Sequence, residues 1–132
     1  MPKRVDRFDS TYSHFTKQVL ETIREEIFGP DIGQNSWNTV EEYDRFLSWL
    51  DLLPEHHILE VASGSGGPAC YLADRLGCRV TGIDANEAGV NAAAQRAAKL
   101  NQADRVTLPS RTRIRDCLSL MTRSTRSFAS IR

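Results

Sequence analysis

The chain has 132 residues, of which 40% are hydrophobic, which suits one globular domain with a modest core. Its 17 basic and 17 acidic residues give a formal net charge of zero, so the overall charge does not indicate nucleic acid or a membrane as a partner. No apolar run approaches the roughly 20 residues that span a bilayer, and the 3 cysteines lack metal-ligand spacing, so we expect a cytoplasmic protein with reduced thiols and no metal.

Two amphipathic helices are predicted before the first strand. The first begins at residue 9 or 10 and runs to about Phe28, where a Gly-Pro pair ends it. Its apolar positions recur with helical spacing, at Tyr12, Phe15, Val19, Ile23 and Ile27. The second helix begins near Thr39, which has the spacing of a capping box with Glu42, and ends before Pro54.

The stretch from Ile58 to Asp84 is predicted to form a strand, a glycine-rich turn, a helix and a second strand. The first strand is an apolar run that ends at Ala62, and the turn spans Gly64–Gly67. Pro68 suits the first turn of the helix that follows, and Gly77 suits a left-handed cap at its end. A second apolar run ends directly before Asp84. This is one βαβ unit whose turn lets a ligand approach the backbone closely.

A fourth helix and a third strand are predicted after this unit. Asn86 caps a helix from Glu87 to Leu100, whose six alanines favour helix and permit close packing on a sheet. The strand begins at Arg105 and ends near Leu108. The order α-α-β-α-β-α-β predicts an α/β fold with an open, mainly parallel sheet and two N-terminal helices alongside.

Two carboxylates mark the carboxyl ends of the first two strands. Glu60 lies inside the first strand's run, shortly before Gly64, and Asp84 follows the second strand. Because parallel strands end at the same edge of a sheet, both acids are expected where open α/β sheets bind ligands. An acid about 20 residues after such glycines accepts hydrogen bonds from ribose hydroxyls. The spacing therefore predicts a nucleoside-containing cofactor.

The glycine turn leaves two classes of cofactor open. Gly64 to Ala69 fits the G-x-G-x-x-G/A fingerprint of NAD-type dinucleotide binding, so the chain could be a fragment of an oxidoreductase. A strand that precedes a pyrophosphate site usually stays apolar up to its first glycine, however, and Glu60 interrupts this strand. This carboxylate favours the second class.

The spacing Glu60-x-Ala62-x-Gly64-x-Gly66 resembles the first motif of class I S-adenosylmethionine-dependent methyltransferases, which is acid-x-Gly-x-Gly-x-Gly. Thr81–Asn86 resembles that family's second motif, with its ribose-binding acid. Ala62 departs from the pattern, since it replaces the first glycine, and we expect the turn to tolerate this small-for-small change.

The resemblance implies a Rossmann-like sheet that binds S-adenosyl-L-methionine and serves methyl transfer to a small-molecule acceptor. It places the methionyl end of the cofactor on the backbone of the turn, which Glu60 organises, and the ribose on Asp84. The implied cofactor-binding residues are Glu60, Ala62, Ser63, Gly64, Gly66, Asp84, Ala85 and Asn86. It implies no catalytic residue in this chain, because the family's acceptor-side residues follow its fourth strand.

The resemblance also divides the chain into three parts. Residues 1–53 are expected to form an N-terminal helical cap, and residues 54–108 a partial S-adenosylmethionine-binding α/β domain truncated after about three strands. Residues 109–132 are expected to be an irregular basic tail, because the last 26 residues hold six arginines and one acid without a convincing period. Since this tail lacks interleaved aromatics and a recognisable module, we do not expect it to bind nucleic acid.

The tail also suggests a change of reading frame. Read one base out of frame, Leu118 to Ile131 permits codons for a segment that resembles the family's approach to its fourth strand, and the codons of Met121 and Thr122 force one aspartate in it. We therefore hypothesise a frameshift near Leu108. We expect the 132-residue chain to be the inactive front part of a methyltransferase, with a sheet edge open to self-association. The alternative is a non-catalytic remnant with a basic tail.

Overall fold

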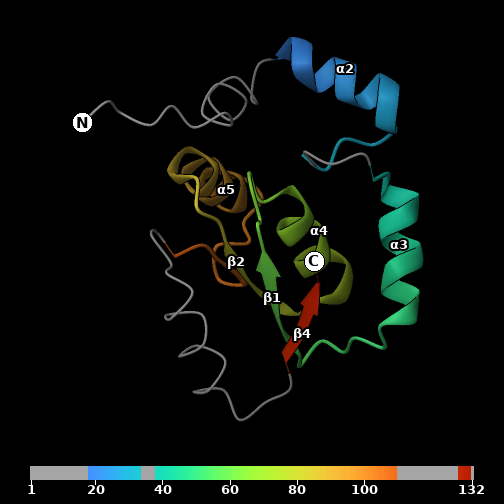
Figure 1. Cartoon of the computed structure of the whole chain (residues 1–132), viewed down its shortest axis with the longest axis vertical. Helices are drawn as coiled ribbons and strands as arrows, with labels where there is room; N and C mark the ends of the chain where they lie inside the picture. The colour runs from blue at the N-terminus through green and yellow to red at the C-terminus, as the bar shows by residue number, and fades with distance from the viewer. Residues whose placement is uncertain (1–17, 34–37, 110–127, 132) are drawn as a thin grey trace.

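The computed structural model describes residues 18–33, 38–109 and 128–131 (Figure 1). The elements from α2 to β3 follow the predicted order, and β4 is an addition to it: α2 (Gln18–Phe28), α3 (Val40–Trp49), β1 (His57–Val61), α4 (Gly67–Leu76), β2 (Arg79–Ile83), α5 (Glu87–Lys99), β3 (Val106–Thr107) and β4 (Phe128–Ile131). The first predicted helix agrees with α2 over its second half, and its residues 9–17 lie outside the described part of the chain. The helix α3 ends at Trp49, earlier than its predicted end before Pro54.

The four strands form one parallel sheet in the order β3-β2-β1-β4. The central strand β1 pairs with β2, so that Glu60 lies opposite Gly82, and with β4, so that Glu60 lies opposite Ile131. The strand order reverses between β1 and β4, and open α/β sheets bind ligands outside the carboxyl ends of the strands at such a switch point. The predicted Rossmann-like, mainly parallel sheet is confirmed.

The strand β4 corrects the predicted extent of this sheet. The sequence predicts truncation after about three strands, to which β4 adds a fourth. It also predicts an irregular tail over residues 109–132, and this is wrong at Phe128–Ile131. A strand forms there because β1 would otherwise leave its outer backbone groups unpaired, and the aromatic and β-branched ends of this segment favour extended backbone. The rest of the predicted tail, residues 110–127 and 132, lies outside the described residues.

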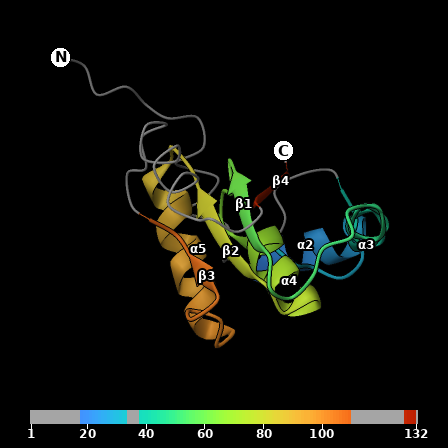
Figure 2. The ribbon, with the colours of Figure 1, turned by 90° about the horizontal axis from the view of Figure 1, so that it is seen from below.

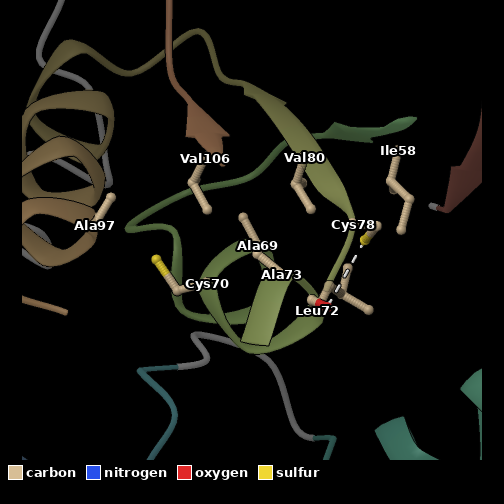
Figure 3. Close-up of a cluster of buried hydrophobic side chains, with 9 residues drawn as sticks. All are labelled: Ile58, Ala69, Cys70, Leu72, Ala73, Cys78, Val80, Ala97 and Val106. Carbon is tan, nitrogen blue, oxygen red and sulfur yellow. Dashed lines mark hydrogen bonds between the residues drawn. The ribbon is translucent and has the colours of Figure 1, made fainter. Parts of the chain in front are cut away.

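The helices α4 and α5 cover one face of the sheet (Figure 2). Small side chains on both helices allow a close approach, and the core between helices and strands is a single buried cluster (Figure 3). It comprises Ile58, Ala69, Cys70, Leu72, Ala73, Cys78, Val80, Ala97 and Val106. Because side chains alternate along a strand, Leu59 and Ile83 form a separate small cluster. The helix α4 begins with Pro68 in its first turn and ends at Gly77, whose φ is 67°, as the sequence predicts.

The helix α3 is connected to α4 through one carboxylate. Asp44 accepts a hydrogen bond from the hydroxyl of Tyr71 at 2.7 Å and forms an ion pair with Arg75 at 3.3 Å. The predicted capping box at the start of α3 is confirmed, because the hydroxyl of Thr39 accepts from the amide of Glu42 while the carboxylate of Glu42 accepts from the amide of Thr39. This cap fixes the direction in which the chain enters α3.

The apolar stripe of α2 is exposed over its described length. Val19, Ile23 and Ile27 keep 70%, 43% and 62% of their surface accessible. On the polar side of α2, the buried Arg24 pairs with Asp31, which follows the helix. Within the described ranges, no helix is both long enough and apolar enough to cross a membrane.

Candidate functional site

The turn between β1 and α4 reverses the chain at the carboxyl edge of the sheet. Three of its residues have a left-handed backbone: Ala62 at φ 61°, Gly64 at 52° and Gly66 at 75°. Glycine adopts this conformation without cost, whereas the Cβ of alanine crowds the following carbonyl group. The turn does accept Ala62 in place of the first glycine of the motif, but in a strained conformation.

Close packing explains why glycine occupies one position in this turn and one beside it. A Cβ on Gly66 would lie 2.6 Å from the Cβ of Ala93 in α5. A Cβ on Gly82 would lie 2.8 Å from the side chain of Ser63. Because atoms this close would overlap, the turn fits against α5 and β2 only in the absence of side chains at these positions. The turn is thus held on two sides by its neighbours.

Asp84 fixes the turn from the end of β2. Its Oδ2 accepts a hydrogen bond from the amide of Gly64 at 2.8 Å, and its Oδ1 accepts one from the amide of Asn86 at 2.8 Å. The side-chain oxygen of Asn86 accepts from the amide of Gly89 and caps α5, which confirms the predicted cap. A carboxylate has about four acceptor positions, so Asp84 retains some for the hydroxyl groups of a ligand.

Glu60 provides the second carboxylate of the edge, and its surroundings differ from those of Asp84. Its Oε2 is buried and has no hydrogen-bond partner among the described residues. Burial first, and the negative charge of Asp84 second, raise the pKa of Glu60 to about 7. The buried hydroxyl of Ser63 also lacks a hydrogen bond within the described chain. Unpaired buried polar groups are costly, so these two oxygens are candidate contacts for the donors of a ligand.

The structure brings all eight predicted cofactor-binding residues to the same edge of the sheet. They occupy the end of β1, the glycine turn and the three residues after β2: Glu60, Ala62, Ser63, Gly64, Gly66, Asp84, Ala85 and Asn86. The expected organiser of the turn was Glu60, but the hydrogen bond to the turn comes from Asp84, and among the described residues Glu60 donates or accepts none there. The binding roles of these residues stay predictions.

A third segment at the site is one that the sequence does not predict. The residues Asp31–Gly33, which we call the strap, follow α2 and lie against the glycine turn. The carbonyl oxygen of Gly33 accepts a hydrogen bond from the hydroxyl of Ser65 at 3.2 Å. A Cβ on Gly67 would collide with the backbone of the strap at Ile32 and Gly33. More than 30 residues separate the two segments in sequence, so no local periodicity could indicate this contact.

Comparison with known protein families decides between the two cofactor classes. The profile described as the methyltransferase domain matches residues 58–126, which is just over half of the chain. The chain belongs to the methyltransferase-domain family. This confirms the predicted resemblance and sets the NAD-type alternative aside. A comparison with curated proteins finds no match.

Several solved structures are similar to this methyltransferase domain. YjhP from E. coli is 27% identical, with a TM-score of 0.54, over 74% of this chain and 34% of its own. An RNA methyltransferase from Salinibacter ruber, in complex with S-adenosyl-L-homocysteine, is 26% identical, with a TM-score of 0.50, over 53% and 46%. A SAM-dependent methyltransferase from Geobacter sulfurreducens, in complex with the same ligand, is 38% identical, with a TM-score of 0.48, over 52% and 28%. The chain spans less than half the length of each.

Proposed function

We propose that this methyltransferase-domain chain binds S-adenosyl-L-methionine at the carboxyl edge of β1 and β2. The observation that carries the proposal is the pair of acids beside the glycine turn. Asp84 orients the turn while retaining acceptor positions, and Glu60 holds a buried oxygen that has no donor among the described residues. The S-adenosyl-L-homocysteine held by the Salinibacter ruber RNA methyltransferase supports this assignment.

The positions of the residues suggest how the cofactor would lie. Its ribose hydroxyls donate to Asp84, and its adenine lies along Ala85 and Asn86. Its methionyl end lies on the backbone of Ala62–Gly66, within reach of the unpaired oxygen of Glu60. The cofactor carries two cationic groups, a sulfonium and an ammonium, and the two carboxylates at this edge attract them.

The reaction that we propose is methyl transfer to a small-molecule acceptor. The bound cofactor supplies a methyl group already activated by the positive sulfur. The chain's own residues then have to hold the cofactor in one orientation, because alignment of the two reactants accounts for much of the acceleration in such a transfer. We assign no catalytic base to this chain.

The organisation and surroundings of the chain complete the proposal. Residues 1–53 act as a helical cap on the cofactor-binding part, residues 54–108, whose sheet β4 extends. A reducing compartment such as the cytoplasm suits Cys70 and Cys78, which are free and buried. Among the described strands β4 lies at one edge of the sheet, and self-association through this edge is also part of the proposal.

A paired titration tests the proposed cofactor. The folded chain is titrated by calorimetry with S-adenosyl-L-homocysteine and with NAD. We expect binding of the first and none of the second. Asp84→Asn is the test variant, and Asp74→Asn, which removes an exposed charge on α4, is its matched control. Binding of NAD, or a folded chain that binds neither compound, overturns the proposal.

A further inference from the structure

The strap is held in place by a buried ion pair. The Nε of Arg24 donates to both carboxylate oxygens of Asp31, at 3.1 and 3.0 Å, and a terminal nitrogen lies 2.9 Å from Oδ2. The side chains are only 10% and 9% exposed. Asp31 also bends the strap, because its Oδ1 accepts from the amide of Gly33 at 2.7 Å. This geometry is that of a fixed contact rather than a solvated surface pair.

The strap in turn contacts the glycine turn and α5. The hydroxyl of Ser65 donates to the carbonyl of Gly33 at 3.2 Å, and this serine is buried. A guanidinium nitrogen of Arg96, on α5, donates to the carbonyl of Ile32 at 3.3 Å. The strap lies so close to Gly67 that no side chain fits there. The glycine turn, the start of α4 and α5 therefore all contact the backbone of the strap.

We propose that Arg24 and Asp31 are positioning residues for cofactor binding. They lock the strap against Ser65 and Gly67, and the locked strap holds the glycine turn in the conformation that receives the methionyl end of the cofactor. Neither residue touches the cofactor in this arrangement. The inference rests on the proposed function, and it adds that the N-terminal segment controls the site through its backbone.

The physical reason lies in how the turn is restrained. Asp84 fixes Gly64 through a hydrogen bond, and α5 restricts Gly66 on one side. Among the described residues, the side chain of Ser65 is held only by its hydrogen bond to the strap. Loss of the strap would free this part of the turn to sample other conformations. A binding site whose competent conformation is populated less has a proportionally weaker apparent affinity.

A double-mutant cycle in the 132-residue chain tests the inference. Asp31→Asn releases the strap, and Ser65→Ala removes the strap's hydrogen bond to the turn without altering the ion pair. We expect each to weaken binding of S-adenosyl-L-homocysteine, Asp31→Asn by about tenfold or more, and the double variant to bind no more weakly than Asp31→Asn. Additive losses mean that the strap does not act through Ser65 and overturn the inference.

A matched control separates this effect from a general loss of stability. Glu41→Gln breaks the exposed ion pair with Arg45 on α3 and should leave the affinity and the exchange of the turn amides unchanged. If Asp31→Asn does not fold, Arg24→Lys takes its place, since lysine keeps the charge but not the two-oxygen contact. A variant that melts earlier yet binds with unchanged affinity when folded assigns the pair a merely structural role and overturns the inference.

Hydrogen exchange without ligand distinguishes failure of the inference from failure of the proposed function. If the folded parent does not bind S-adenosyl-L-homocysteine, the proposed function fails for this chain. The inference then still predicts faster exchange at the amides of Gly66 and Gly67 in Asp31→Asn and Ser65→Ala than in Glu41→Gln. Equal exchange in all three variants overturns it.

Discussion

The carboxylate of Asp84 and the amide of Gly64 lie 2.8 Å apart across 20 residues of sequence. This hydrogen bond connects the end of β2 to the turn that follows β1, so the two halves of the candidate site form one unit before a ligand arrives. A site that is already ordered loses less conformational entropy on binding. Asp84 therefore holds the turn, and we propose that it also receives the cofactor.

Removal of the Asp84 charge should weaken cofactor binding. In Asp84→Asn the amide still accepts one backbone hydrogen bond, but the charged acceptor for the ribose hydroxyls is lost. Hydrogen bonds to charged groups contribute roughly 1.5–3 kcal/mol each, so we expect the affinity for S-adenosyl-L-homocysteine to fall about tenfold or more. Calorimetry measures the change, and Asp74→Asn should match the parent. Equal affinities in Asp84→Asn and the parent would remove Asp84 from the site.

Glu60 should make stability depend on pH. The folded protein raises its pKa from 4.5 to about 7, so the folded state binds a proton that the unfolded chain has released. The stabilisation is complete below pH 4.5 and is lost as the pH rises through about 7. Relative to Glu60→Gln, the parent should lose on the order of 3 kcal/mol of unfolding free energy across this window. Urea titrations of both proteins check this, and parallel pH profiles would contradict it.

The same carboxylate should make cofactor affinity rise with pH. A cationic ammonium group beside Glu60 favours the ionised form, so binding releases a proton wherever the free protein holds one. We expect the affinity for S-adenosyl-L-homocysteine to increase up to about pH 7 and then level off, and Glu60→Gln to abolish the increase. Calorimetry in buffers of different ionisation enthalpy measures the proton release. A flat profile in the parent would place the ammonium group elsewhere.

Ala62→Gly should stabilise the chain. The left-handed φ of 61° strains an alanine, and a glycine would relieve about 1 kcal/mol of this, partly offset by the greater freedom of the unfolded chain. Urea denaturation measures the gain. Ala94→Gly, at an exposed position in the middle of α5, should instead destabilise by about 1 kcal/mol. If both changes destabilise equally, the turn does not strain Ala62.

Gly66→Ala should destabilise the chain more than Gly29→Ala. The two glycines have nearly the same φ, 75° and 76°. A Cβ on Gly29 meets no atom of the described residues within 4 Å, whereas one on Gly66 would lie 2.6 Å from the Cβ of Ala93. Both substitutions therefore carry the same cost of placing an alanine at a positive φ. The difference between their losses of unfolding free energy measures the collision with Ala93, for which we expect about 1–3 kcal/mol. Urea denaturation measures it. Adding Ala93→Gly should recover much of the loss, and no recovery would refute the packing explanation.

The 132-residue chain should show no methyl transfer with small-molecule acceptors. The chain spans less than half the length of the structures it resembles. We assign no residue of it to binding the methyl acceptor. The strand β4 removes one reason for this expectation, because it covers the flank of β1 that was expected to be bare. Assays with labelled S-adenosyl-L-methionine check activity, and the coding DNA around Leu108 checks the frameshift. Robust turnover, or an unbroken reading frame with an active chain, would contradict this expectation.

The sequence by itself determined the βαβ unit and the edge where the candidate site lies. Short-range signals sufficed: an apolar run of strand length, a proline in the first turn of α4, Gly77 at its end and the capping box of α3. The two acids follow from the same logic, because Glu60 and Asp84 stand at the ends of adjacent parallel strands whatever surrounds them.

Only the tertiary structure decided what these residues contact. The hydrogen bond from Gly64 to Asp84, the packing of Gly66 on Ala93 and the docking of the strap on Ser65 each join segments that are distant in sequence. The pairing of β4 with β1 belongs to the same group, since no period marks Phe128–Ile131 as a strand. Periodicity reports which face of an element is apolar, whereas these contacts depend on which elements meet, and that is set by the packing of the whole sheet.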